Sequence, residues 1–425
     1  MRSIVINYLI YLTVFLLPWQ TRWIFGAEFL QGEVWEYGVL SFFLTEILVV
    51  LVAVLRPRIV SNPHFDWPLI FGGFFLLACL AKVTGSINPT LAVMAWLHIL
   101  IAFFFFHNLL DKRVETRKVL YAFVLGLIIP SFLGLWQFFT GTSPEFSWLG
   151  LAGHEAVTAG TSVVETLNGR IMRAYGSFQH PNLFGGYLAF GLVCLMMLPR
   201  WYRKLRDRRL LMLISILLAT AFILTFSRSA WLAFFIAAFI GGWVLLWEHR
   251  VAVKKAMPYL TVTLLAIIVS LVLFWQPVAT RFHPSFRLEA QSIAERQAGY
   301  ELYLPTVQDQ LWLGVGVGNY TVEQATDFPG SPVWAFQPIH NSLLLILGEV
   351  GIIGLIFFLL WVGSIDRINF KAFPRSTAIG AMALGNVVLV IALFDHYLFS
   401  LWPGLALAAL MFALTLRLSE PTVDE

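Results

Sequence analysis

Charged residues are scarce in this chain, since 12% of its 425 residues are charged and 59% are hydrophobic. Soluble domains carry about 25% charged residues. A water-soluble core of this length does not need so much apolar surface, so we expect a lipid bilayer to surround most of the chain. No stretch of the sequence resembles a soluble domain, a repeat array or a low-complexity tract.

The sequence is also poor in the residues of common redox, metal and nucleotide sites. Its two cysteines, Cys79 and Cys194, lie in apolar runs and indicate neither a disulfide framework nor a metal site. There is no Asp-x-Asp motif, no His/Cys ligand cluster and no Walker loop. The run Gly314-Val-Gly-Val-Gly-Asn lacks the context of a dinucleotide loop, and we expect its glycines to form a tight bend close to the membrane. We therefore expect no metal, no cofactor and no nucleic acid.

Long apolar runs recur along the whole chain. A spanning helix needs about 20 mostly apolar residues. By that length the sequence predicts an all-α polytopic membrane protein, with a single integral membrane domain over residues 1–425 and about 12 transmembrane helices. The carboxylate of Glu349, inside one of these runs, is expected to have a buried partner or to face a cavity. The helices are predicted near residues 4–19, 35–55, 66–81, 91–110, 118–140, 180–199, 210–226, 229–247, 257–275, 340–362, 376–394 and 398–417.

The positions of Lys and Arg define the predicted orientation. With the amino terminus in the cytoplasm, every inner loop is basic, and 20 of the 28 Lys and Arg residues lie on the inner side. This distribution follows the positive-inside rule. We expect a multi-pass protein of the cytoplasmic (inner) membrane with both termini in the cytoplasm. The other eight basic residues are predicted on the outer face, namely Arg22, Lys82, Arg170, Arg173, Arg228, Arg281, Arg287 and Arg296.

Two of the predicted outer loops are long, at about 141–179 and 276–339. Loops longer than about 12–15 residues are usually functional or disordered, and the aromatic residues and glycines of these two argue against disorder. The second loop is expected to contain short helices, including a polar helix over about 288–310. A third outer turn, at 225–230, is very short. We expect the active site on this outer face.

Three outer arginines are candidates for binding an anion. Arg228 stands in a Ser-Arg-Ser turn between two apolar runs, where it is either a snorkelling interfacial residue or a clamp for phosphate oxygens. Arg296 follows Glu295 on the polar loop helix, where it is either part of an exposed ion pair or a second arginine on the same anion. Arg173 precedes the start of a membrane helix and is equally well explained as a structural tie between loop and helix.

His340 is the candidate general base. It stands at the start of a long apolar helix and faces a polar loop. An imidazole with an ordinary pKa near 6.5 can remove a proton at neutral pH. The alternative is that Asn341 caps the helix and His340 is only its polar neighbour. His180 and His396 are rival bases, and we expect Asp395 to orient His340 or to pair with an arginine.

Four pieces of the sequence resemble, in the same order, the O-antigen ligase and polymerase superfamily. All four lie within roughly residues 170–355, and the twelve-helix topology extends the resemblance over the whole chain. They are Arg173-Ala-Tyr-Gly-Ser-Phe-Gln-His-Pro-Asn, Phe226-Ser-Arg-Ser-Ala, the stretch from Glu295-Arg296 through Gly314-Val-Gly-Val-Gly-Asn-Tyr, and the stretch from His340-Asn341 through Glu349-Val-Gly-Ile-Ile-Gly.

The resemblance implies a metal-independent glycosyltransferase on the outer face of the cytoplasmic membrane. Its donor would be a glycan on undecaprenyl pyrophosphate. Its acceptor would be a lipid or glycan hydroxyl, in the lipid A core for a ligase or in the next repeat unit for a polymerase, and we prefer the ligase. Arg228 and Arg296 resemble the arginines that hold the pyrophosphate, His340 the base, and Asp395 the acidic residue of the last outer turn. From the residues alone, a transporter of an anionic solute remains the alternative from another class, because outer arginines and broken helices would serve it too.

Overall fold

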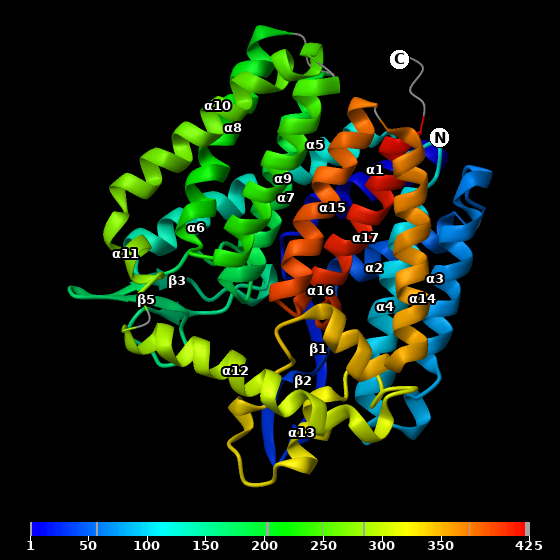
Figure 1. Ribbon diagram of the computed structural model, residues 1–425, viewed down its shortest axis with the longest axis vertical. Helices are drawn as coiled ribbons and strands as arrows, with labels where there is room; N and C mark the ends of the chain where they lie inside the picture. Colours follow the sequence, from blue (N-terminus) through cyan, green and yellow to red (C-terminus); the bar gives the residue numbers. More distant parts are fainter. Residues whose placement is uncertain are drawn as a thin grey trace.

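The computed structural model describes residues 2–56, 58–200, 204–248, 250–283, 285–373 and 375–420, and within them the chain is mainly helical (Figure 1). Three helices are short: α11 (Trp275–Thr280), α13 (Tyr320–Asp327) and α16 (Tyr397–Ser400). The longer helices are α1 (Arg2–Leu16), α2 (Leu44–Leu55), α3 (Asp66–Leu80), α4 (Pro89–Leu109), α5 (Thr116–Gly126), α6 (Ile128–Thr140), α7 (Pro181–Met197), α8 (Leu205–Leu224), α9 (Arg228–Glu248), α10 (Arg250–Leu273), α12 (Arg287–Val307), α14 (Ser342–Ala372), α15 (Ser376–Phe394) and α17 (Trp402–Ser419).

Several of these helices can cross a bilayer. Among the described residues, 7 helical stretches are long and apolar enough, namely Pro63–Gly85, Pro89–Leu109, Thr116–Thr140, Lys254–Leu273, Ser342–Ala372, Ser376–Phe394 and Trp402–Ser419. Four shorter apolar helices are Ser3–Leu16, Leu44–Leu55, Pro181–Met197 and Arg228–Val244. These findings agree with a multi-pass helical membrane protein, and the full number of twelve spans stays a prediction.

The predicted helix over 35–55 is wrong in its first half. Residues Glu33–Phe43 form strand β2, which pairs in antiparallel register with β1 (Arg22–Leu30), and α2 begins only after it. Gln31 and Gly32 join the strands with φ angles of 50° and 85°, and such positive values are typical of a two-residue hairpin turn. The valine, tryptophan, tyrosine and phenylalanine residues of β2 favour the pleated conformation. Apolar content alone did not distinguish this strand from a helix.

The description of the fold as all-α needs a second correction in the loop after α6. Two further antiparallel pairs form there. The first joins β3 (Thr142–Ser143) and β4 (His154–Glu155), and the second joins β5 (Val163–Thr166) and β6 (Gly169–Met172). The described part of the chain is therefore a helical bundle that carries three small hairpins.

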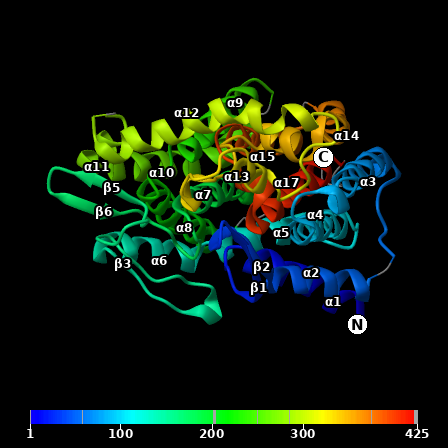
Figure 2. The ribbon, with the colours of Figure 1, turned by 90° about the horizontal axis from the view of Figure 1, so that it is seen from below.

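The elements outside the bundle gather at one end of it. In Figure 1 the hairpins, α12 and α13 lie at the lower end, whereas α1 begins and α17 ends at the upper end. Figure 2, which looks onto the lower end, shows α12 lying across the ends of the bundle helices. We refer to this lower end as the loop end of the molecule.

Helix α7 connects the loop end to the centre of the bundle and is buried along almost its whole length. Its glycines permit close packing at the loop end. A Cβ atom at Gly185 would lie 2.9 Å from the Cβ of Ser227, in the turn before α9, and a Cβ at Gly186 would collide with the hydroxyl of Tyr397. The start of α7 is thereby held against both the α8–α9 turn and the corner between α15 and α16.

Helix α14 is broken at Gly351, which has φ 72° and ψ −175°. The backbone groups left open by the break pair with the glycine-rich loop before α13. The N–H of Val315 donates to the carbonyl of Gly348 at 2.9 Å, and the N–H of Ile352 donates to the carbonyl of Leu311 at 2.8 Å. A break inside an apolar helix is tolerated where neighbouring groups satisfy its freed hydrogen bonds.

The glycine-rich loop forms the tight bend that the sequence predicts. Gly314, Gly316 and Gly318 all have positive φ angles, of 73°, 100° and 72°. The buried carboxylate of Glu349, next to the break, accepts hydrogen bonds from the backbone N–H groups of Gly318 (2.8 Å) and Tyr320 (3.4 Å). The expected buried partner of Glu349 is therefore the backbone of this loop.

Replacing Gly351 by alanine is expected to destabilise the protein strongly. The backbone angles at this position suit only glycine, and an added Cβ would collide with the backbone of Trp312. Strain of this kind together with a steric clash costs roughly 2–5 kcal/mol. Thermal unfolding in detergent would measure the effect. Gly363→Ala on the same helix is the control, because a Cβ there meets nothing within 4 Å; equal midpoints for the two variants would contradict the expectation.

Candidate active site

Most of the polar residues singled out from the sequence lie at the loop end. They come from five places: the segment before α7, the α8–α9 turn, helices α11 and α12, the start of α14, and the α15–α16 corner. Hydrogen bonds, ion pairs and ring contacts connect most of these positions, and electrostatic interactions connect Arg296. The group is described below from its arginines to its histidines.

Arg228 and Arg281 share one carboxylate. The guanidinium of Arg281 pairs with Oε1 of Glu289, and Nη1 of Arg228 lies 3.4 Å from Oε2 of the same residue. Nη1 of Arg228 also donates to the carbonyl of Arg281 at 2.9 Å. The side chain of Arg228 remains 29% exposed, so one of two guanidinium groups on a single buried carboxylate still faces the loop end. This pairing leaves an excess positive charge, which suits an anionic ligand.

The turn that carries Arg228 is held in an uncommon conformation. Phe226 has a φ of 49° although it is not glycine, and it is fully buried. Nε of Arg281 donates to its carbonyl at 3.2 Å. Nε of Arg173 donates to the carbonyl of Thr225 at 2.7 Å. The two flanking arginines therefore fix the turn, and non-glycine residues at positive φ are often found at functional sites.

Arg173 begins a line of hydrogen bonds that ends at the histidines. Its Nη2 donates to Oδ1 of Asn182 at 2.6 Å, and Nδ2 of Asn182 donates to Oδ2 of Asp395 at 3.2 Å. Oδ1 of Asp395 accepts from the backbone N–H of His396 at 3.0 Å. Arg173 is buried, and burial, helped by the charge of Arg281, lowers its pKa well below the ordinary value. These contacts agree with the structural tie, which was one of the two interpretations of Arg173.

His340 lies beside His396 at the end of this line. The two rings are nearly perpendicular, with centroids 5.4 Å apart. Tyr37, from the β1–β2 hairpin, packs against His396 at 5.8 Å. Asn341 caps α14 by accepting hydrogen bonds from the N–H groups of Leu343 and Leu344, each at 3.0 Å. Asn341 is therefore the cap, as the alternative interpretation expected, and the cap makes no use of the His340 imidazole.

The three histidines differ in the use of their ring nitrogens. Nδ1 of His180 accepts the backbone N–H of Asn182 at 3.1 Å, so His180 caps the start of α7, and Nδ1 of His396 bonds to Oγ of Ser400 at 2.7 Å. Burial lowers the pKa of His180 to about 3 and that of His396 to about 4. In the part of the chain that the structure describes, the His340 imidazole has no hydrogen-bond partner. Both ring nitrogens of His340 are therefore available to a ligand, whereas one nitrogen of each of the other two rings is engaged.

Charged residues of the loop end act on the pKa of His340. Burial lowers the pKa of His340 below its ordinary value, the carboxylate of Asp395 opposes this, and the charge of Arg296 adds to it. Burial also lowers the pKa of Arg281, and Arg296 again contributes. Arg296 is half-buried on α12 and makes no ion pair with another described residue. Its charge therefore acts on both Arg281 and His340.

Contacts thus link four of the five residues proposed from the sequence, His340, Arg228, Arg173 and Asp395, to this group, and Arg296 is related to it only through its charge. The structure adds residues that sequence reasoning did not single out as parts of a site. Arg281 was only one of eight outer basic residues, and Glu289 carried no signal beyond its place at the start of the polar helix. Asn182 and Tyr37 could be identified only from their contacts. No group of three or more His, Cys, Asp or Glu residues able to hold a metal occurs within the described ranges.

Comparison with known proteins relates part of the chain to one family. A family model described as O-antigen ligase matches residues 213–359. The match confirms the expected relationship to the O-antigen ligase superfamily, and its stretch contains Arg228, Arg281, Glu289, Arg296 and His340. No curated protein matches the sequence significantly.

Proposed function

We propose that this chain, with an O-antigen ligase match over residues 213–359, is a membrane glycosyltransferase of that type. It transfers a glycan from undecaprenyl pyrophosphate to a sugar hydroxyl of the lipid A core or a similar acceptor. Transfer takes place on the outer face of the cytoplasmic membrane and needs neither a metal nor a nucleotide. The observation that carries the proposal is that a series of contacts at the loop end links Arg228 to His340, and that both lie inside the matched stretch together with Arg296, whose charge acts on His340.

The arginines act on the leaving group. As the acceptor oxygen forms its bond to the anomeric carbon of the donor, the bond from that carbon to the pyrophosphate oxygen breaks. Negative charge then builds on the lipid pyrophosphate. The partly exposed guanidinium of Arg228 and that of Arg296, which forms no ion pair within the described residues, stabilise this charge, which is the usual role of such groups in a transition state.

His340 acts on the acceptor. Its neutral imidazole takes the proton of the attacking hydroxyl, which makes the oxygen a better nucleophile. Asp395, held by Asn182 and Arg173, fixes the backbone of His396, and His396 packs against His340. These four are positioning residues that keep the base at the mouth of α14. The proton and the leaving group thus depart on separate sides of the transferred sugar.

The proposed reaction is a direct displacement with inversion at the anomeric carbon, because both carboxylates of this group are already engaged, Glu289 by the arginines and Asp395 by Asn182 and the backbone of His396. Comparing the anomeric configuration of donor and product by NMR tests this step. A product with the same configuration as the donor would rule out the direct displacement.

The rate of transfer is expected to fall as the pH drops below the pKa of His340. Burial lowers that pKa, so the neutral, active form of the imidazole prevails at pH 7 and the rate declines only below about pH 6.5, the ordinary value for histidine. Removing the charge of Arg296 should raise the pKa of His340, because that charge disfavours the imidazolium. Arg296→Gln should therefore move the acid side of the profile to higher pH.

Glu295→Gln is the matched control for this titration. Glu295 precedes Arg296 on α12, and its charge raises the pKa of His340. Removing it should move the acid side of the profile to lower pH, opposite to the effect of Arg296→Gln. Rates measured from pH 5 to 9 for the two variants and the wild type test whether His340 is the group that titrates. Shifts of the same sign, or no shift in either variant, would contradict the role of His340 as the base.

Ligase and polymerase differ in what accepts the glycan, and one assay separates them. Purified protein in liposomes is given undecaprenyl-pyrophosphate glycan with and without lipid A core. We expect glycosylated lipid A core only when both are present. Lengthening of the donor glycan without the core would identify a polymerase. Uptake of an anionic solute with no glycosylated product would favour the transporter.

A further inference from the structure

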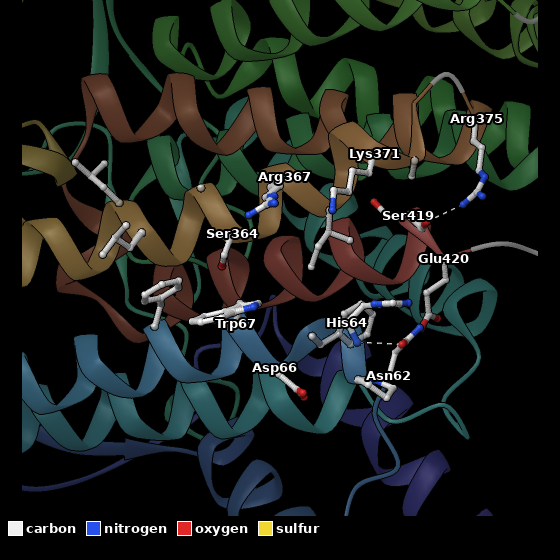
Figure 3. A pocket seen from close by; sticks show the side chains of 18 residues that line it. Asn62, His64, Asp66, Trp67, Ser364, Arg367, Lys371, Arg375, Ser419 and Glu420 are labelled. Atoms are coloured by element: carbon white, nitrogen blue, oxygen red, sulfur yellow. Dashed lines mark hydrogen bonds between the residues drawn. The ribbon is translucent and has the colours of Figure 1, made fainter.

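A cavity of about 900 Å³ lies at the end of the molecule opposite the candidate active site (Figure 3). It is formed between the beginning of α3 and the last part of α14. Nearer the loop end the two helices pack closely: the rings of Phe74 and Phe357 stack at 5.2 Å, and Ala78 lies against Gly354. Toward Asp66 and Lys371 the helices separate, and the cavity fills the space between them.

The wall of the cavity changes from apolar to basic along α14. Leu359 and Leu360 line its apolar part, together with Phe71 of α3, and Arg367 and Lys371 line the basic part. Arg367 and Lys371 are four residues apart, so they lie on the same face of the helix. The rise of a helix places Lys371 about 16 Å beyond Leu360 along its axis. The cavity therefore offers apolar walls at one end and cations at the other, which is the polarity of a phospholipid.

Acidic residues within the described ranges do not neutralise the two cations. Arg367 and Lys371 form no ion pair with any residue that the structure describes. Among the acidic residues of the wall, Glu420 is engaged elsewhere, since it accepts from Asn62 at 3.2 Å and lies 3.6 Å from Arg417. The other is Asp66, on the α3 side. Figure 3 shows it beside Trp67 and opposite Arg367 and Lys371.

We propose that this cavity binds the head group of an anionic phospholipid from the cytoplasmic leaflet, with its acyl chains along Phe71, Leu359 and Leu360. Basic pockets between membrane helices on the cytoplasmic side attract such lipids. The amphipathic ring of Trp67 suits the interface between head group and hydrocarbon. The proposal rests on the predicted orientation of the chain and is independent of glycan transfer.

Lipid binding to the purified full-length protein tests the proposal. Native mass spectrometry would compare phosphatidylglycerol with phosphatidylcholine of the same acyl chains. We expect preferential retention of phosphatidylglycerol, and a loss of affinity of at least about tenfold when Arg367→Gln and Lys371→Gln are combined. Lys254→Gln with Lys255→Gln is the matched control, because it removes two exposed basic residues on the same predicted face outside the cavity. The control should retain the wild-type affinity.

A second variant separates the cavity from general surface charge. A Cβ at Gly363, which lines the cavity, meets nothing within 4 Å, so Gly363→Phe fills the space without altering any charge. It should lower the retention of phosphatidylglycerol to that of phosphatidylcholine. Equal retention by the wild type and the Arg367/Lys371 variant would overturn the proposal. Displacement of the lipid by inorganic phosphate would also overturn it, since the site would then be one for soluble anions.

Discussion

Replacing His340 by alanine is expected to lower the rate of glycan transfer by about 10²–10⁴-fold, the usual contribution of a general base. The imidazole has no hydrogen-bond partner among the described residues, and Asn341 alone caps α14. The substitution therefore removes the base without removing a structural contact of the helix start. Donor affinity should change little, because His340 acts on the acceptor. Initial rates and donor binding, measured on the same preparation, give both quantities.

His64→Ala is the matched control for this variant. His64 is exposed and lies at the opposite end of the molecule, in the wall of the 900 Å³ cavity. It should transfer glycan at the wild-type rate. A His340→Ala variant that folds and retains a rate within about twofold of the wild type, well short of the contribution of a general base, would show that another group takes the proton. His396 would then be the first alternative to test.

Replacing Arg228 by alanine is expected to reduce kcat/KM for the donor by about 10²–10³-fold, as the loss of one preorganised charge-stabilising group does. Glu289 keeps its pairing with Arg281 in this variant, so no buried carboxylate is left without a partner. In contrast to His340→Ala, donor affinity itself should fall. Arg228→Lys should restore only part of the activity, because an ammonium group cannot bind two phosphate oxygens in the way a guanidinium does.

Arg287→Ala tests whether any outer arginine would give the same loss. Arg287 begins α12, is 69% exposed and pairs with Glu165 at 2.7 Å. Exposed ion pairs of this kind contribute about 0–1 kcal/mol, so this variant should retain activity and stability. Equal losses for Arg228→Ala and Arg287→Ala would indicate that the overall charge of the outer face matters rather than a pyrophosphate site.

The sequence predicted most helices because an apolar run of twenty residues has few other stable conformations in a bilayer. It failed over 35–55, where the run begins in a hairpin. The Gln31-Gly32 turn and the aromatic residues of β2 were the available signals, but a count of apolar residues does not include them. The short pairs β3–β4 and β5–β6 have too few residues to show a pattern of alternation.

The candidate site was predictable only in part. Arg228 and His340 could be found because each stands at the start of a long apolar run, where a polar residue is conspicuous. Arg281 and Glu289 are ordinary polar residues of a long loop. Their pairing depends on how α12 lies across the bundle, and this placement cannot be derived from a single sequence. The role of Asn182, between Arg173 and Asp395, likewise depends on a contact with a residue 213 positions away.

The most direct test of the proposed activity is the release of undecaprenyl pyrophosphate during glycan transfer. Purified wild-type protein in liposomes is mixed with the lipid-linked glycan and lipid A core, in EDTA and without nucleotide, and both products are quantified over time. One undecaprenyl pyrophosphate released for each glycan transferred, with both products lost in His340→Ala and Arg228→Ala, is the expected result. Folded protein that forms neither product, or that forms them only after a metal ion is added, would contradict the proposed metal-independent transferase.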